Sequence, residues 1–298
     1  MKARYLLFFA VLLLGLTGVQ DKKPVENRNK KSIPWGVTDW PPYYILEGSH
    51  NGEGKIDLLK RLLEKNIPDY SFVDVQSDIP KAIELWKQNR NLCAGSVLKT
   101  PEREKWAYFT ALSFVVPHQY LAVVARKEIL PKGGDIMSFR ELTSRKDLKG
   151  VIIHDRSYGP VIDELIKKAD SNLTALNPSE GYMPLLKMVQ KGRFDYTIEY
   201  ESVVAAYNER IKPEKPVYSK LLKETSPSAI IWAACTKNAW GREVVRRIDE
   251  VLRKSAGKKE YHNAVEAWSD PIILRKNQKA LDEFYERRAQ SWSTINVE

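Results

Sequence analysis

Arg103 is the residue whose position in this sequence most clearly indicates binding chemistry. It follows Thr100, a residue type that caps helices, and Pro101, which is favoured at the first helical position. The helix macrodipole disfavours a positive charge in this first turn, so an arginine there is expected to have a partner. A guanidinium matches a carboxylate with two parallel hydrogen bonds. We therefore predict that Arg103 points into a solvent-filled cleft and clamps a ligand carboxylate. A surface ion pair with a neighbouring glutamate is the alternative.

A second group of candidate binding residues comprises Arg156, Ser157 and Tyr158, just before a helix expected to begin near Pro160. The free backbone N–H groups of a helix N-terminus bind anions. A serine at this place can also be a plain helix cap, and the two roles are compatible. Arg156 either reaches into the same cleft or lies on the surface.

Aromatic and small residues follow two of the expected strands. Trp40 and Tyr43 come after the first strand and can stack on a ligand, or they can be aromatic residues of the rim or core. Gly95 and Ser96 lie near the end of a buried strand, where glycine lets backbone groups approach a ligand closely. A buried Ser96 that bonds to the backbone is the alternative for that residue.

The composition excludes several other kinds of site. The chain of 298 residues has two cysteines and four histidines without metal-ligand spacing, so we predict no metal and no cofactor. The net charge is +10, but half of it lies in the first 32 residues, and elsewhere Lys and Arg alternate with Asp and Glu. No nucleic-acid-binding motif accompanies this charge, so a nucleic-acid partner is not expected.

The first residues have the order of a secretory signal peptide. Lys2 and Arg4 precede the apolar run 5–14, which is too short to span a bilayer, and small and polar residues follow it. No cysteine lies near the end of the run, so lipid anchoring is not indicated, and an uncleaved anchor helix is the alternative. We predict a signal peptide over 1–20, a flexible charged leader over 21–32 and a periplasmic mature protein.

The rest of the sequence alternates apolar strands with amphipathic helices, which is typical of α/β folds. The strand expected over 229–235 and the helices after it are too few for a domain of their own, so we expect them to complete the first unit. The sequence thus predicts two lobes, with lobe 1 formed by 33–120 plus 229–298 and lobe 2 by 121–228. Each lobe should hold a mostly parallel sheet flanked by helices. Two crossover strands near 120–126 and 225–231 are expected to act as hinges.

A series of short motifs lies in order along residues 33–268. They are Trp40-Pro41-Pro42-Tyr43, the helix start from Gly54 to Asp57, Ala94-Gly95 followed by Thr100-Pro101-Glu102-Arg103, the segment Asp147-Leu148-Lys149-Gly150-Val151, Gly192-Arg193-Phe194-Asp195, and the stretch 258–268 with its tyrosine and tryptophan. Together they resemble the motifs of family 3 bacterial extracellular solute-binding proteins, the periplasmic receptors of polar amino-acid transporters. The last residues, 269–298, extend beyond the usual end of that family.

The resemblance implies a type II periplasmic binding fold with a ligand site between the lobes, at the carboxyl ends of the strands. It implies a protein that is not an enzyme and has no catalytic residues. Such a protein captures a small polar carboxylate or amino-acid-like ligand for an ABC-type transporter. Its partner would be an inner-membrane permease or sensor, and we expect a monomer. The expected ligand-binding residues are Asp39, Trp40, Tyr43, Ser96, Thr100, Arg103, Ser157, Tyr158, Glu199 and Tyr200.

Two positions depart from the family's pattern. Leu98 stands where the family usually has serine or threonine, and Tyr200 stands where it usually has an aspartate that binds the ligand's amino group. Either neighbouring glutamate, Glu199 or Glu201, could supply the missing carboxylate. A small carboxylate, a peptide fragment or a modified amino acid is therefore as compatible with the sequence as a standard L-amino acid.

Two other functions stay open at this stage. A stand-alone ligand sensor for a membrane signalling partner would have the same fold. An enzyme similar to the cyclohexadienyl dehydratases would need a carboxylic acid in the cleft as general acid, and Glu199 is the candidate.

The pairing of the two cysteines is also open. Cys93 and Cys235 both lie on apolar strands of lobe 1. We expect two buried free thiols there, although export would permit a disulfide.

Overall fold

The computed structural model describes residues 30–111, 121–169, 172–177, 182–225, 231–269 and 271–290. The predicted signal peptide and nearly all of the predicted leader lie outside the described residues. Of the two expected crossover strands, residue 120 of the first and residues 226–230 of the second also lie outside them. The strand that the sequence placed from Ile33 onward begins at Lys31. None of the helices in the described ranges is both long and apolar enough to cross a membrane.

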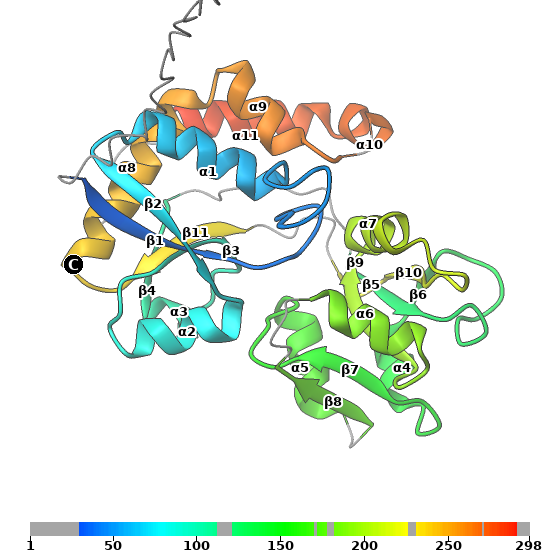
Figure 1. Cartoon of the computed structure of the whole chain (residues 1–298). Helices are drawn as coiled ribbons and strands as arrows, with labels where there is room; N and C mark the ends of the chain where they lie inside the picture. Colours follow the sequence, from blue (N-terminus) through cyan, green and yellow to red (C-terminus); the bar gives the residue numbers. More distant parts are fainter. Residues whose placement is uncertain are drawn as a thin grey trace, which may run out of the picture. The chain divides into compact units, whose positions relative to one another are not determined.

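The first sheet contains five strands in the order β2-β1-β3-β11-β4. They are β1 (Lys31–Val37), β2 (Tyr70–Gln76), β3 (Cys93–Val97), β4 (Ala107–Phe109) and β11 (Trp232–Thr236). β1 pairs in parallel with β2 and β3, whereas β11 pairs antiparallel with β3 and β4. The late strand β11 therefore completes the sheet that the first part of the chain begins, as Figure 1 shows.

Helices cover both faces of this sheet (Figure 1). One face carries a group of helices that contact one another, namely α1 (Lys55–Asn66), α8 (Ala239–Ser255), α9 (Lys259–Glu266) and α11 (Gln278–Gln290). On the other face α2 (Ile79–Lys87) packs against β3 and β11. The short helices α3 (Pro101–Glu104) and α10 (Pro271–Lys276) follow β3 and α9 along the chain. The amphipathic patterns explain this packing, because Leu59, Leu62 and Leu63 of α1 and the valines of α8 are buried.

The second sheet has six strands in the order β6-β10-β5-β9-β7-β8. They are β5 (Leu121–Ala125), β6 (Ile136–Met137), β7 (Gly150–Ile153), β8 (Leu173–Leu176), β9 (Tyr196–Tyr200) and β10 (Tyr218–Leu222). Its helices are α4 (Phe139–Ser144), α5 (Pro160–Lys168), α6 (Met183–Gln190) and α7 (Glu201–Ile211). Both α6 and α7 pack against β5 and β9.

The α/β class with two helix-flanked sheets is confirmed, and the strand pairing is more mixed than the sequence predicts. β5 pairs antiparallel with β9 and β10, while β7 pairs in parallel with β8 and β9. The antiparallel pairs arise where strands from distant parts of the chain, such as β11, enter a sheet that βα units begin. Strand direction at such positions is set by the path of the chain rather than by any local pattern.

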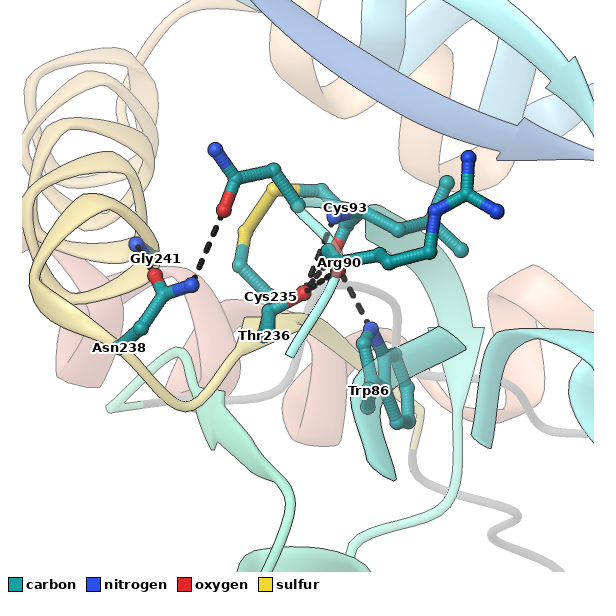
Figure 2. Close-up of a disulfide and its surroundings, with 9 residues drawn as sticks. Trp86, Arg90, Cys93, Cys235, Thr236, Asn238 and Gly241 are labelled. Carbon is teal, nitrogen blue, oxygen red and sulfur yellow. Dashed lines mark hydrogen bonds between the residues drawn. A yellow bond between two sulfur atoms is a disulfide. The ribbon is translucent and has the colours of Figure 1, made fainter. Parts of the chain in front are cut away.

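Cys93 and Cys235 form a disulfide between β3 and β11, 142 positions apart in sequence (Figure 2). The expectation of two free thiols is therefore wrong. The two residues lie directly opposite each other in the antiparallel register, and their Cα atoms are 4.0 Å apart. Beside the bond, the Thr236 hydroxyl donates to the backbone carbonyl of Arg90 at 2.6 Å (Figure 2). The register decides the pairing, and no spacing in the sequence reveals it.

Candidate functional site

The helix that carries Arg103 begins as its sequence predicts. The Thr100 hydroxyl accepts a hydrogen bond from the Arg103 N–H at 3.3 Å, and Pro101 occupies the first turn of α3. The side chain does not point into solvent, however, because Arg103 is only 5% exposed. Its guanidinium donates to the carbonyl of Leu98 and to the carbonyl of Asp155, both at 2.9 Å. It thereby joins the segment after β3 to the segment after β7.

Arg103 is a buried cation whose direct partners are neutral. Among the residues that the structure describes, no carboxylate lies within ion-pair distance of its guanidinium. Burial lowers the pKa of Arg103, and the nearby Tyr182, Asp163 and Asp155 oppose this effect. A guanidinium remains protonated in such surroundings, and its direct hydrogen-bond partners are two carbonyl oxygens.

A second buried arginine, Arg156, has a carboxylate partner. Its two terminal nitrogens donate to the two oxygens of Glu199, each at 2.7 Å, and both side chains are less than a tenth exposed. Burial alone would lower the pKa of Arg156, but the charge and hydrogen bonds of Glu199 raise it well above its ordinary value. Of the two glutamates that the sequence left open, Glu199 is therefore the buried one, while Glu201 is exposed at the start of α7.

Aromatic rings surround the Arg156 guanidinium. Its carbon Cζ lies 5.4 Å from the ring centre of Trp40, 4.9 Å from those of Tyr158 and Tyr182, and 5.7 Å from that of Tyr200. We call these four rings the aromatic cage. Each of these residues is at most 4% exposed. Trp40 comes from the segment after β1, and the others come from the part of the chain that forms the second sheet.

Tyr43 extends the aromatic cage on the side of Trp40. The two rings are stacked, with centroids 4.1 Å apart, and Tyr43 also lies 5.9 Å from Tyr200. The loop that carries them is held by the start of α1, where a side-chain carbon on Gly54 would come within 2.4 Å of the Tyr43 carbonyl oxygen. The N–H of the Trp40 indole is buried without a hydrogen-bond acceptor in the described part of the chain.

The helix N-terminus at Ser157 and Tyr158 is already occupied by the chain's own carboxylate. The Ser157 hydroxyl donates to one oxygen of Asp163 at 2.5 Å, and the Tyr158 N–H donates to the other at 2.7 Å. Asp163 lies in the first turn of α5, where the macrodipole favours a negative charge. The predicted anion-binding groups thus bind a carboxylate of the chain itself, and the N-cap residue of α5 is Gly159 rather than Ser157. Burial raises the pKa of Tyr158, whose ring belongs to the aromatic cage, to about 12.

Asp39 and Ser96 are not part of the aromatic cage. Asp39 accepts hydrogen bonds from Arg210 at 2.6 Å and from the N–H of Leu46 at 3.2 Å. It lines a groove of about 1080 Å³ together with Glu47 and residues of α6 and α7. Ser96 is half-buried near the end of β3, one residue after Gly95.

Tyr182 is the residue of this site that sequence reasoning missed. It precedes α6 as its N-cap position and contacts both Trp40 and Arg156. A single tyrosine before a helix carries no local signal of a binding role. Arg156, which the sequence left as either a cleft or a surface residue, is buried.

The assembled residues favour binding over reaction chemistry. They offer two guanidiniums, one carboxylate and a wall of aromatic rings. Burial raises the pKa of Tyr200 to about 12, which keeps its phenol protonated at neutral pH. No group of histidine, cysteine, aspartate or glutamate residues that could hold a metal occurs among the described residues.

No protein-family model and no curated protein matches the sequence. Solved structures do match the fold. An ancestral arginine-binding protein bound to arginine has a TM-score of 0.62 at 18% identity, covering 81% of this chain and 100% of that chain. The substrate-binding protein of an amino acid ABC transporter has a TM-score of 0.58 at 19% identity, with 80% and 99% covered.

A third similar structure is a sensor domain rather than a transporter's binding protein. A histidine kinase sensor domain with similarity to periplasmic binding proteins has a TM-score of 0.63 at 15% identity, covering 81% of this chain and 97% of that chain. These likenesses extend over both sheets and over nearly the whole length of each neighbour. The chain therefore has the two-lobed α/β fold of periplasmic solute-binding proteins.

Proposed function

We propose that this protein is an exported solute-binding protein that captures a small carboxylate between its lobes and delivers it to an ABC-type transporter. The lobes would be 33–120 plus 229–298 and 121–228. The observation that carries the proposal is Arg103, a buried guanidinium whose partners in the described chain are two neutral carbonyls. A ligand carboxylate would replace the Asp155 carbonyl and supply the negative charge that this arginine lacks.

The indole of Trp40 supports the same ligand chemistry. Its buried N–H has no acceptor in the described chain, and a buried donor without an acceptor is costly. A carboxylate oxygen would satisfy it. Because Trp40 packs directly against Tyr182 and Tyr200, a ligand can enter only when these contacts separate. Hinge opening and closure around a ligand is the usual motion of two-lobed receptors.

The structurally similar proteins support a role in transport. One of them is described as part of an amino acid ABC transporter, which supports a membrane permease as partner. The proposal also includes export through a cleaved signal peptide, a periplasmic location and a monomeric state. Export and location rest on the layout of the first residues, and the monomeric state rests on the fold.

A sensor for a membrane signalling protein is the second candidate, because a histidine kinase sensor domain has a similar fold. The enzyme alternative is less well supported. Both oxygens of Glu199 accept hydrogen bonds from Arg156, an arrangement that suits an acceptor rather than a proton donor.

The test begins with the ligand. Native mass spectrometry of protein purified from its source identifies any retained molecule. Calorimetric titration then compares that molecule with short carboxylates, L-amino acids and N-acetyl amino acids. We expect binding of at least one carboxylate, and Arg103→Ala should weaken it by roughly 30- to 4000-fold, since truncating one partner of a desolvated charge pair costs ~2–5 kcal/mol.

The controls separate binding from folding. Arg103→Lys should restore only part of the affinity, because an ammonium lacks the planar fork. Lys105, just after α3, is an exposed cation that pairs with Glu102. Lys105→Ala should leave the affinity for the ligand unchanged. Since Arg103 is buried, thermal melting of each variant is measured alongside. A folded Arg103→Ala protein with affinity within about threefold of wild type, or a wild-type protein that binds no carboxylate, would contradict the proposal.

A further inference from the structure

The environment of Arg156 has the features of a binding site for a ligand cation. Electron-rich rings attract a cation that lies within about 6 Å of their centres, and all four rings of the aromatic cage meet that distance. The cage is closed by a buried carboxylate, Glu199, whose two oxygens face the guanidinium in the planar, two-bond geometry that carboxylates prefer. The occupant of this site is a side chain of the protein itself.

Glu199 is largely committed to partners in the chain, because three hydrogen bonds already use most of the roughly four acceptor positions of its carboxylate. Each of its oxygens accepts a hydrogen bond from Arg156 at 2.7 Å, and one of them also accepts the N–H of Tyr200 at 2.8 Å. The carboxylate is 3% exposed. A ligand ammonium or guanidinium could reach it only by expelling Arg156 and leaving that charge without its partner, which is strongly unfavourable in a buried site.

We propose that Arg156 is a specificity-determining residue that occupies the subsite for a ligand cation, so that the protein rejects ligands with an ammonium or guanidinium group. The inference rests on the proposed function, because both concern one site. With Arg156 and Glu199 neutralising each other, Arg103 is the buried cation of the site that has no direct carboxylate partner in the described chain. The ligand class then narrows to carboxylates without an adjacent cationic group.

The experiment removes the Arg156 side chain by substitution and supplies a free guanidinium compound in solution. Full-length mature protein is titrated with methylguanidinium by calorimetry, with thermal melting measured in parallel. Wild-type protein should not bind this probe measurably. Arg156→Ala should bind it with an affinity at least ~10-fold above the weakest affinity that the calorimeter detects, because the rings and the carboxylate are then free to accept it.

Two further variants isolate the cause. Arg156→Ala combined with Glu199→Gln removes the carboxylate as well and should lose the gained binding. Arg145→Ala removes an exposed arginine that pairs with Asp147, and should behave as wild type. If Arg156→Ala alone does not fold, methylguanidinium should restore a cooperative melting transition, whereas the double variant should fold without it.

The outcomes are distinct from those for the proposed function. Equal affinity of wild type and Arg156→Ala for methylguanidinium, or an unfolded Arg156→Ala protein that the probe does not rescue, would overturn the inference, even if wild type binds a carboxylate through Arg103. Conversely, gained methylguanidinium binding in a protein that takes up no carboxylate would support the role of Arg156 and remove the proposed function.

Discussion

Three buried cationic side chains of this protein have hydrogen-bond partners of different kinds. The partner determines whether the positive charge of each side chain is neutralised. Arg156 has a carboxylate and is neutralised. Arg103 has two carbonyl partners, and in the proposed function it is the residue that binds a ligand anion. Lys55, which is 1% exposed, donates to the Ser269 hydroxyl at 3.1 Å. Burial lowers the pKa of Lys55 to about 8, and the charge of Glu266 opposes this only in part.

Lys55 should make stability depend on pH in the weakly alkaline range. Its pKa of about 8 in the folded protein lies below the value of 10.5 for a free lysine, so between these values the unfolded chain binds the extra proton. Stability from this residue therefore rises with pH across that window and is constant below it. The free energy of unfolding of wild type, measured relative to Lys55→Met, should increase by roughly 2 kcal/mol from about pH 7.5 to pH 9.5.

Chemical denaturation at several pH values measures this difference. Lys65→Met replaces an exposed lysine of the same helix, and its difference from wild type should not vary with pH in this way. A flat difference for Lys55→Met would show that the ammonium of Lys55 is solvated in the native protein.

At the scale of elements, helix α11 belongs to the group of helices that covers one face of the first sheet. Helix α11 packs on α8, burying Phe284 and Tyr285. The Tyr285 hydroxyl donates to Glu266 in α9 at 2.9 Å, and Arg288 pairs with Asp249 in α8 at 3.3 Å. Helix α11 therefore has a structural role, because it covers a face of α8 that would otherwise be exposed.

Shortening the side chain at position 284 should destabilise the fold by about 3–5 kcal/mol, the usual cost of a large-to-small substitution at a buried phenylalanine. Phe284 is 6% exposed, whereas its neighbour Glu283 is exposed. Urea denaturation of Phe284→Ala and Glu283→Ala compares the two positions. Equal stabilities would mean that α11 does not pack on α8 in solution.

The disulfide acts at the scale of the whole molecule. It joins β3 to β11 in the first sheet, and the chain between the two cysteines forms the entire second sheet. A bond that closes so long a loop restricts the unfolded chain strongly, even though the native structure gains few contacts from it. Its formation also agrees with export to an oxidising compartment.

Replacing both cysteines, Cys93→Ala with Cys235→Ala, should lower the free energy of unfolding by about 2–5 kcal/mol. Reduction of the wild-type protein should produce a similar loss, and the same reductant should leave the double variant unchanged. Denaturation curves with and without dithiothreitol make the comparison. If the reduced and oxidised wild-type proteins unfold at the same denaturant concentration, the cross-link does not constrain the unfolded chain.

Local patterns predicted local structure well. Thr100 and Pro101 begin α3, and Asp78 caps α2 by accepting the N–H of Lys81, as their types and spacing indicate. At α4 the capping residue also has a distant partner. Ser138 accepts the N–H of Glu141, but its hydroxyl donates to Glu224, a residue far along the chain. Capping depends on neighbours within four residues, so a sequence can specify it.

The sequence by itself determined the alternation of strands and helices, and with it the α/β class, because hydrophobic periodicity and capping residues act over a few positions. It also marked Arg103 and Trp40 as candidates. Only the tertiary structure decided that Arg103 is buried against the carbonyl of Asp155, that Glu199 rather than Glu201 turns inward, and that Arg156 fills the aromatic cage. These outcomes depend on strand register and on contacts between segments more than 40 residues apart, for which no local pattern exists.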